Sequence, residues 1–230
     1  LGFAAARIFD EFDPIEKEKN KLFEEKGISG RRAIMKALKE AEKVALEYLE
    51  LDSMPEAERD EARYEELKND QMTQYMVLDS LANVFCPACK LWNTGHGAEV
   101  MRQAISLMGG YGITEDCPGF LFHKWMDAQL EATYEGPEAV QRRHLSVTML
   151  SPLFLAQFKR WSREMRKIAN ARPQTGACGL ATSMELWLWT LEHLQVARDA
   201  LGNKLYHGSR QGVTFALADA LCWLLASRSL

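Results

Sequence analysis

The chain has 230 residues, of which 47% are hydrophobic, so it can form the core of one large domain or two small ones. Its formal net charge is −4, which argues against a surface built to hold nucleic-acid phosphates or an anionic membrane. We therefore expect neither nucleic acid nor a membrane as a partner.

The five cysteines form an odd, scattered set, which is not a disulfide framework and favours a reducing, cytoplasmic setting. Cys86-Pro87-Ala88-Cys89 has the spacing of a thiol redox motif, but it lies in a helical pattern and not beside a βαβ pattern. We interpret the pair as structural, and a low pKa for the Cys86 thiol would reverse that interpretation. The five histidines lack metal-ligand spacing, so no metal site is predicted.

Helix-forming residues dominate the chain and no alternating strand is apparent, so the predicted fold is all-α. Asp13-Pro14 predicts the start of a charged helix that runs to Gly27. Apolar residues at three- and four-residue steps then predict a long amphipathic helix from Ser29 to Leu49. This second helix is expected to contribute to the core.

Ser53-Met54-Pro55-Glu56 predicts another helix start, and the polar run 56–70 is either an exposed helix or a mobile loop. The apolar pattern 72–85 predicts a further helix, which Pro87 should end or kink. We expect a break at 95–97 and then a helix over 99–108 that ends at Gly109.

An irregular stretch is expected after Gly112, with the next helix beginning near Pro137. Three more helices are predicted over 154–171, 180–201 and 211–227. The last of these contains Asp219 and is too short for a membrane span. The predicted organisation is a helical bundle over 1–150 and a helical C-terminal extension packed on it over 151–230. The lack of an initiator Met suggests a piece of a longer protein.

Two turns in the segment 104–144 suggest a chemistry. The first is Gly109-Gly110-Tyr111-Gly112, which by itself is explained as a helix C-cap. The second is Tyr134-Glu135-Gly136, followed by a new helix. Taken alone, a Glu beside a Gly-Pro turn is usually exposed or a capping group, although the turn could also direct Glu135 into a cavity between helices.

The order of these turns resembles the C-terminal helical domain of the flavin-dependent acyl-CoA dehydrogenases, whose fold is an up-and-down helical bundle. The resemblance implies FAD as cofactor and an acyl-CoA thioester as substrate. It makes Glu135 the catalytic base that removes the α-proton while flavin accepts the β-hydride. It further implies flavin contacts and substrate contacts at the following positions. The flavin-contacting residues are Ser106, Met108, Gly109, Gly110, Pro137 and Ala139, and the substrate-binding residues are Tyr134 and Gly136.

The chain departs from the family pattern at three polar positions, which are Ser106, Met126 and Pro137 here. The resemblance implies an oxidoreductase of fatty-acid metabolism, a homo-oligomer, and an electron-transfer flavoprotein as partner. The family's N-terminal helical domain and middle β-domain do not appear in the sequence, so these residues alone should be inactive. The alternative is a catalytically inactive helical assembly module. Coding sequence upstream of Leu1 would discriminate the two.

Overall fold

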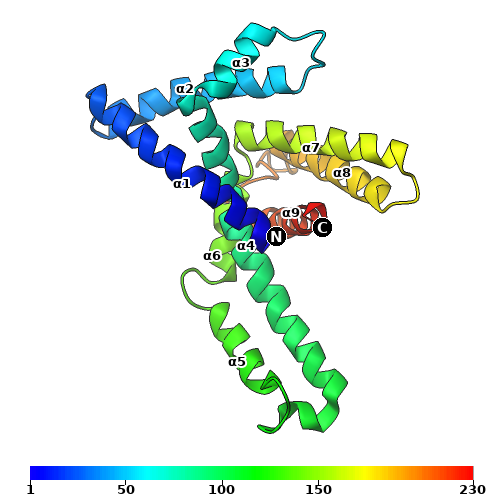
Figure 1. The fold of residues 1–230 in the computed structure, drawn as a ribbon. Coiled ribbons are helices and arrows are strands. Elements are labelled where there is room, and N and C mark those ends of the chain that lie inside the picture. The colour runs from blue at the N-terminus through cyan, green and yellow to red at the C-terminus, as the bar shows by residue number, and fades with distance from the viewer. Residues whose placement is uncertain (230) are drawn as a thin grey trace.

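A computed structural model describes residues 1–229. Its elements are helices connected by turns and loops (Figure 1). They are α1 (Gly2–Glu25), α2 (Arg31–Asp52), α3 (Glu61–Asn69), α4 (Gln71–Met108), the 3₁₀ helix η1 (Gly109–Ile113), α5 (Leu121–Glu131), α6 (Glu138–Thr148), α7 (Pro152–Ala171), α8 (Ala177–Val196) and α9 (Gln211–Arg228). The predicted all-α fold is confirmed, because residues 1–229 contain helices and no strand beyond one isolated bridge.

The long helix α4 is the axis of the molecule. Its first half is packed by α1, α2, α6, α7 and α9, and its second half extends away from them (Figure 1). Helices α7 and α8 pair with each other, and α9 packs against α4, α6 and α8. We call the packed part the bundle.

The main core joins the predicted bundle segment to the predicted C-terminal extension. Its buried side chains come from α1, α4, α6, α7, α8 and α9. Phe158 and Trp187 have ring centroids 5.0 Å apart, and the buried Trp187 indole donates a hydrogen bond of 3.0 Å to the Leu217 carbonyl. Burial of such large rings is the main source of stability for a fold of this kind.

Helix α1 begins earlier than predicted. It starts at Gly2 and passes through Pro14, so the expected start at Asp13 is wrong. The residues before Pro14 pack on the core through Ala5, which is buried, and Phe12 stacks on Tyr75 of α4 at 5.7 Å. Packing along α4 therefore outweighs the local preference for a helix start at Asp13-Pro14.

Helix α4 runs through Pro87 and through the expected break at 95–97, so the helix ends at neither position and the expected break is wrong. The alternative prediction, a kink at Pro87, stays a prediction. Proline removes one backbone donor, and the carbonyl that loses it belongs to Asn83, which is an exposed residue. Val84 and Ala88 on either side of Pro87 are fully buried, which holds the helix in place. Gly95 lies beside Glu138 of α6, where a Cβ would be in ordinary contact with the Glu138 carboxylate at 3.5 Å.

Two other helix boundaries differ from the prediction. Asp60, and not Ser53, caps α3, because its carboxylate accepts the Arg63 amide at 3.1 Å. Helix α8 ends at Val196 and not at Leu201, because Asp199 accepts the amides of Leu201 and Asn203 in a loop.

Among the helices of residues 1–229, none combines the length and apolar character needed to cross a lipid bilayer.

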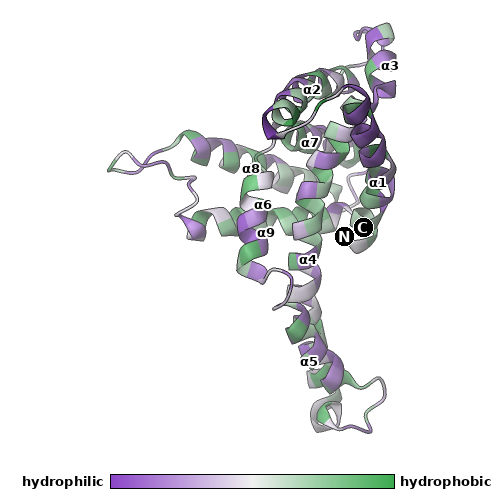
Figure 2. Cartoon of the chain, turned by 90° about the vertical axis from the view of Figure 1, so that its left-hand side faces the viewer, coloured by the Kyte–Doolittle hydropathy of each residue, from purple (hydrophilic) through white to green (hydrophobic). Residues whose placement is uncertain are grey.

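The second half of α4, η1 and α5 form a projection that we call the arm, residues 99–133 (Figures 1 and 2). Residues 114–120 are irregular as expected, but α5 occupies the part of the stretch from Leu121 to Glu131, where the expectation is wrong. Leu121, Phe122, Trp125 and Ala128 are its partly buried residues, and their helical spacing is a signal that sequence reasoning missed. Helix α5 contacts only α4 and η1 within the described chain.

Candidate functional site

The Tyr134-Glu135-Gly136 turn has an unusual backbone. Glu135 adopts φ 50° and Gly136 adopts φ 97°, so both residues lie in the left-handed region. That region is rare for a residue with a side chain and favours glycine. A Cβ on Gly136 would also lie 2.4 Å from the Gln141 amide nitrogen. The turn therefore requires glycine at 136, and Glu135 is held in a conformation that its neighbours must stabilise.

Two side chains from different helices stabilise this turn. Lys90 of α4 donates a hydrogen bond to the Tyr134 carbonyl, and its ammonium lies 4.8 Å from the centre of the Tyr134 ring. Gln141 of α6 donates to the carbonyls of Glu135 and Gly136 at 3.2 and 3.1 Å. The backbone at Glu135 is thus fixed from both sides. No motif in the sequence marks Lys90 for this contact, because it lies 44 residues before Tyr134.

The Glu135 side chain is exposed, so the expectation that it lies in a cavity between helices of this chain is wrong. The reason is the position of the turn at the junction of arm and bundle, where the anchoring contacts come from α4 and α6 alone. Tyr134 is also exposed, and its hydroxyl donates to the Glu131 carboxylate, which raises the pKa of Tyr134. The turn presents both side chains at the surface.

Helix α6, which follows the turn, is fixed to the C-terminal extension by an ion-pair network. The Arg142 guanidinium lies 2.9 Å from the Glu138 carboxylate and 2.8 Å from that of Asp219 on α9. These carboxylates help to raise the pKa of Arg142 against the opposing effect of burial. Asp219 is a second supporting residue that sequence reasoning did not identify, since it lies 77 residues from Arg142 in the chain.

The glycine turn ends α4 as predicted. Gly109 adopts φ 60° at the helix C-cap, and η1 follows. Gly112 is buried, and a Cβ there would lie 2.7 Å from the Ile105 carbonyl oxygen, so only glycine fits without a backbone shift. Gly110, in contrast, has open space where a Cβ would be. Its backbone is accessible to a ligand or a second chain.

The residues implied as flavin contacts fall into two separate groups. Ser106, Met108, Gly109 and Gly110 are exposed at the end of the arm, whereas Pro137 and Ala139 are exposed at the start of α6. Lys90 contacts the Glu135 turn and lies on α4, 16 residues before Ser106. At the rise of an α-helix, the two residues are separated by roughly 24 Å along the helix axis. One chain therefore does not bring the two groups together at one point.

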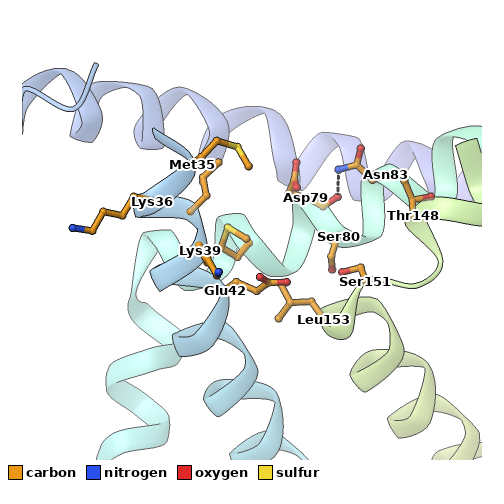
Figure 3. Close-up of a pocket in the computed structure, with 12 residues that line it drawn as sticks. Met35, Lys36, Lys39, Glu42, Asp79, Ser80, Asn83, Thr148, Ser151 and Leu153 are labelled. Carbon is orange, nitrogen blue, oxygen red and sulfur yellow. Dashed lines mark hydrogen bonds between the residues drawn. The ribbon is translucent and has the colours of Figure 1, made fainter. Parts of the chain in front are cut away.

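A cavity of about 630 Å³ lies elsewhere, between α2, α4 and the α6–α7 junction (Figure 3). Asp79 of α4 faces it, with the exposed Met35 of α2 opposite and Ser151 at the third side. Burial raises the pKa of Asp79. None of the residues predicted for flavin or substrate lines this cavity. The cavity is therefore separate from the glycine turn and from the Glu135 turn.

Residues 62–150 match the family model described as the C-terminal domain of acyl-CoA dehydrogenase. This segment, which is less than half of the chain, is therefore similar to the C-terminal domain of acyl-CoA dehydrogenases. The resemblance drawn from the two turns is therefore confirmed, and the match includes the whole arm and the Glu135 turn. Searches of curated proteins and of solved structures gave no match. The first 61 residues and the C-terminal extension lie outside the matched range.

Proposed function

We propose that this chain is the C-terminal part of a flavin-dependent acyl-CoA dehydrogenase that desaturates the α,β bond of an acyl-CoA thioester. The observation that carries the proposal is the Glu135 turn, which lies within the segment that matches the family. Lys90 and Gln141 fix its backbone from two helices, and the Glu135 carboxylate is exposed. A carboxylate held in this way can accept a proton from a substrate that another part of the protein brings against it.

Three residues of the turn have separate roles in the proposed reaction. A Glu135 carboxylate oxygen accepts the substrate α-proton. Gly136 gives the turn its conformation, and Tyr134 borders the position where substrate would bind. Bound FAD supplies the acceptor for the β-hydride. The proposal includes a cytoplasmic location and an electron-transfer flavoprotein as the partner that accepts the electrons from the flavin.

The residues implied for FAD are compatible with two partial sites. Gly109 and Gly110 offer exposed backbone without side chains, and the open space at Gly110 permits close approach. Pro137 and Ala139 lie at the root of the arm, far from these glycines along α4. We propose that the arm of one copy approaches the flavin of a neighbouring copy in a homo-oligomer, with Pro137 and Ala139 at the flavin of their own copy.

The 230 residues alone are expected to be inactive. The exposed Glu135 has no enclosing wall from this chain, and the β-domain that would supply one in the family is absent from residues 1–229. Exclusion of water strengthens the electrostatic interactions of a catalytic group, so an open carboxylate is a poor base. Tests of activity therefore need the full-length protein.

An anaerobic titration of the full-length, FAD-loaded protein with acyl-CoAs tests this proposal through the absorbance of the flavin. We expect the flavin of the natural protein to bleach. In Glu135→Gln the rate of bleaching should fall by a factor of roughly 100 or more. The matched control is Glu115→Gln, an exposed carboxylate in the same segment, which should bleach normally. Bleaching of the Glu135→Gln protein at the natural rate would refute the assignment of the base.

The second candidate is a catalytically inactive helical assembly module. It is favoured by Ser106, whose hydroxyl donates back to the Arg102 carbonyl at 3.1 Å, and by Pro137, which has no side-chain donor for a ligand. Failure of the full-length protein to bind FAD would favour this candidate, whereas FAD binding followed by bleaching would refute it.

A further inference from the structure

The loop between α8 and α9, residues 197–210, forms a cavity of a different kind. Its volume is about 470 Å³ and its lining is polar and basic. The lining residues are Arg198, Gly202, Asn203, Lys204, His207, Ser209 and Arg210. No carboxylate is among them. A cavity of this size lined by cations and neutral donors favours an anion.

Two of the cations are held opposite each other. Arg198 and Lys204 are paired by an antiparallel β-bridge, and both line the cavity. Within residues 1–229 neither forms an ion pair, and Arg198 makes one hydrogen bond of 2.8 Å, to the Gly202 carbonyl. Like charges placed opposite each other across a strand pair repel. An anion between them would turn this repulsion into attraction.

The carboxylate of Asp199, the residue after Arg198, forms no ion pair with Arg198 or Lys204. Asp199 accepts the amides of Leu201 and Asn203, both at 2.9 Å, and its other oxygen pairs with Arg210. These hydrogen bonds, with that of the Asn203 amide first, lower the pKa of Asp199. Asp199 is therefore committed to shaping the loop and leaves Arg198 and Lys204 available.

The loop is fixed before any ligand binds. The Leu205 amide donates to the Ala197 carbonyl at 3.0 Å, and the Tyr206 amide donates to the Leu194 carbonyl at 2.9 Å. The Tyr206 hydroxyl also donates to the Ser146 carbonyl of α6. A site with its groups already ordered loses less entropy on binding.

His207 adds a neutral donor to the cations. The Ser209 hydroxyl lies 2.8 Å from His207 Nδ1 and donates to it. The Ser209 amide donates to His207 Nδ1 at 3.3 Å, which leaves the proton of the neutral imidazole on Nε2 as a donor. Helix α9 begins directly after Arg210 without a capping side chain, so its positive end adds potential of the same sign.

We propose that this loop is a binding site for a phosphate-bearing ligand, such as a phosphomonoester or a pyrophosphate. Several positive groups around one cavity suit the multiple charges and oxygens of phosphate better than a single carboxylate. The phosphate could belong to a free metabolite or to a lipid headgroup. The site lies outside the matched segment and is independent of the proposed dehydrogenase reaction.

The test is a titration of the ¹⁵N-labelled chain with inorganic pyrophosphate at constant ionic strength, followed by NMR. We expect saturable shifts of the amides of residues 198–212, with a Kd that Lys204→Glu raises about tenfold or more. Lys167→Glu on α7 changes an exposed lysine in the same way and should leave the Kd unchanged. Unchanged dispersion of the remaining amides shows that each variant is folded.

Two further arms distinguish the source of the phosphate. Binding of pyrophosphate without sedimentation on phosphatidic acid vesicles supports a soluble ligand. Binding to those vesicles, but not to phosphatidylcholine vesicles, with release by pyrophosphate and loss in Lys204→Glu, supports a lipid headgroup. The proposal is overturned if pyrophosphate gives no saturable shifts in this loop, or if Lys167→Glu weakens binding as much as Lys204→Glu.

Discussion

The bundle and the arm are built in different ways. The bundle has a continuous core from six helices, in which Phe154, Phe158 and Leu191 are fully buried. The arm has two buried residues, Gly112 and Cys117. Its large apolar side chains instead face solvent, among them Leu107 at 87% exposed and Leu130 at 61%. Tertiary packing therefore holds the bundle, whereas backbone geometry at the turns and contact with α4 hold the arm.

The largest expected difference concerns stability. Phe158→Ala should destabilise the chain by about 3–5 kcal/mol, because it leaves a cavity among Phe154, Trp161 and Trp187. Leu130→Ala in the arm should change stability by about 0.5 kcal/mol or less. Urea unfolding followed by circular dichroism measures both. Equal costs for the two substitutions would contradict the contrast between bundle and arm.

A smaller effect is expected inside the arm. Gly112→Ala forces a Cβ against the Ile105 carbonyl, which should destabilise the arm by about 1–3 kcal/mol. Gly110→Ala meets open space and should cost less than about 1 kcal/mol. Native-state hydrogen exchange of the α5 amides measures this local stability. If Gly110→Ala lowers the local stability of α5 more than Gly112→Ala does, the close approach at Gly112 does not hold the turn.

The smallest effect concerns pH. Burial raises the pKa of Asp79, so the folded chain binds this proton more tightly than the unfolded chain. Stability should therefore fall as pH rises through the range above the ordinary Asp pKa. Lys19, Asn83 and Tyr75 oppose the shift, so the slope should be modest.

Urea midpoints between mildly acidic and neutral pH test this, and Asp79→Asn should flatten the slope. Asp10→Asn, an exposed change on α1, should leave the slope as it is in the natural chain. A slope in Asp79→Asn equal to that of the natural chain would contradict the role of Asp79.

The helices of the bundle were largely predictable, because their apolar residues repeat with helical spacing. The boundaries that failed depend on distant residues. Pro87 remains in α4 because Val84 and Ala88 are buried by other helices, and Pro14 remains in α1 because that helix packs along α4. Neither contact is visible in a local pattern.

The candidate site was predictable to the extent that a short motif encodes it. The Tyr134-Glu135-Gly136 turn and its link to Gln141 are local in sequence. The contacts from Lys90 and Asp219 are not, since they join positions 44 and 77 residues apart. The exposure of Glu135 also depends on which elements surround the turn, so a motif alone predicted a cavity that this chain does not form.

Hydrogen exchange of the arm tests the account most directly, in the 230-residue chain and in the full-length FAD-loaded protein. In the chain alone, α5 amides should exchange at least about 100-fold faster than those of α7 and α8, since the arm lacks a core. In the full-length protein, contact with flavin or a neighbouring copy should slow α5. An α5 protected as strongly as α7 in the chain alone, or equally fast in both proteins, would contradict the account.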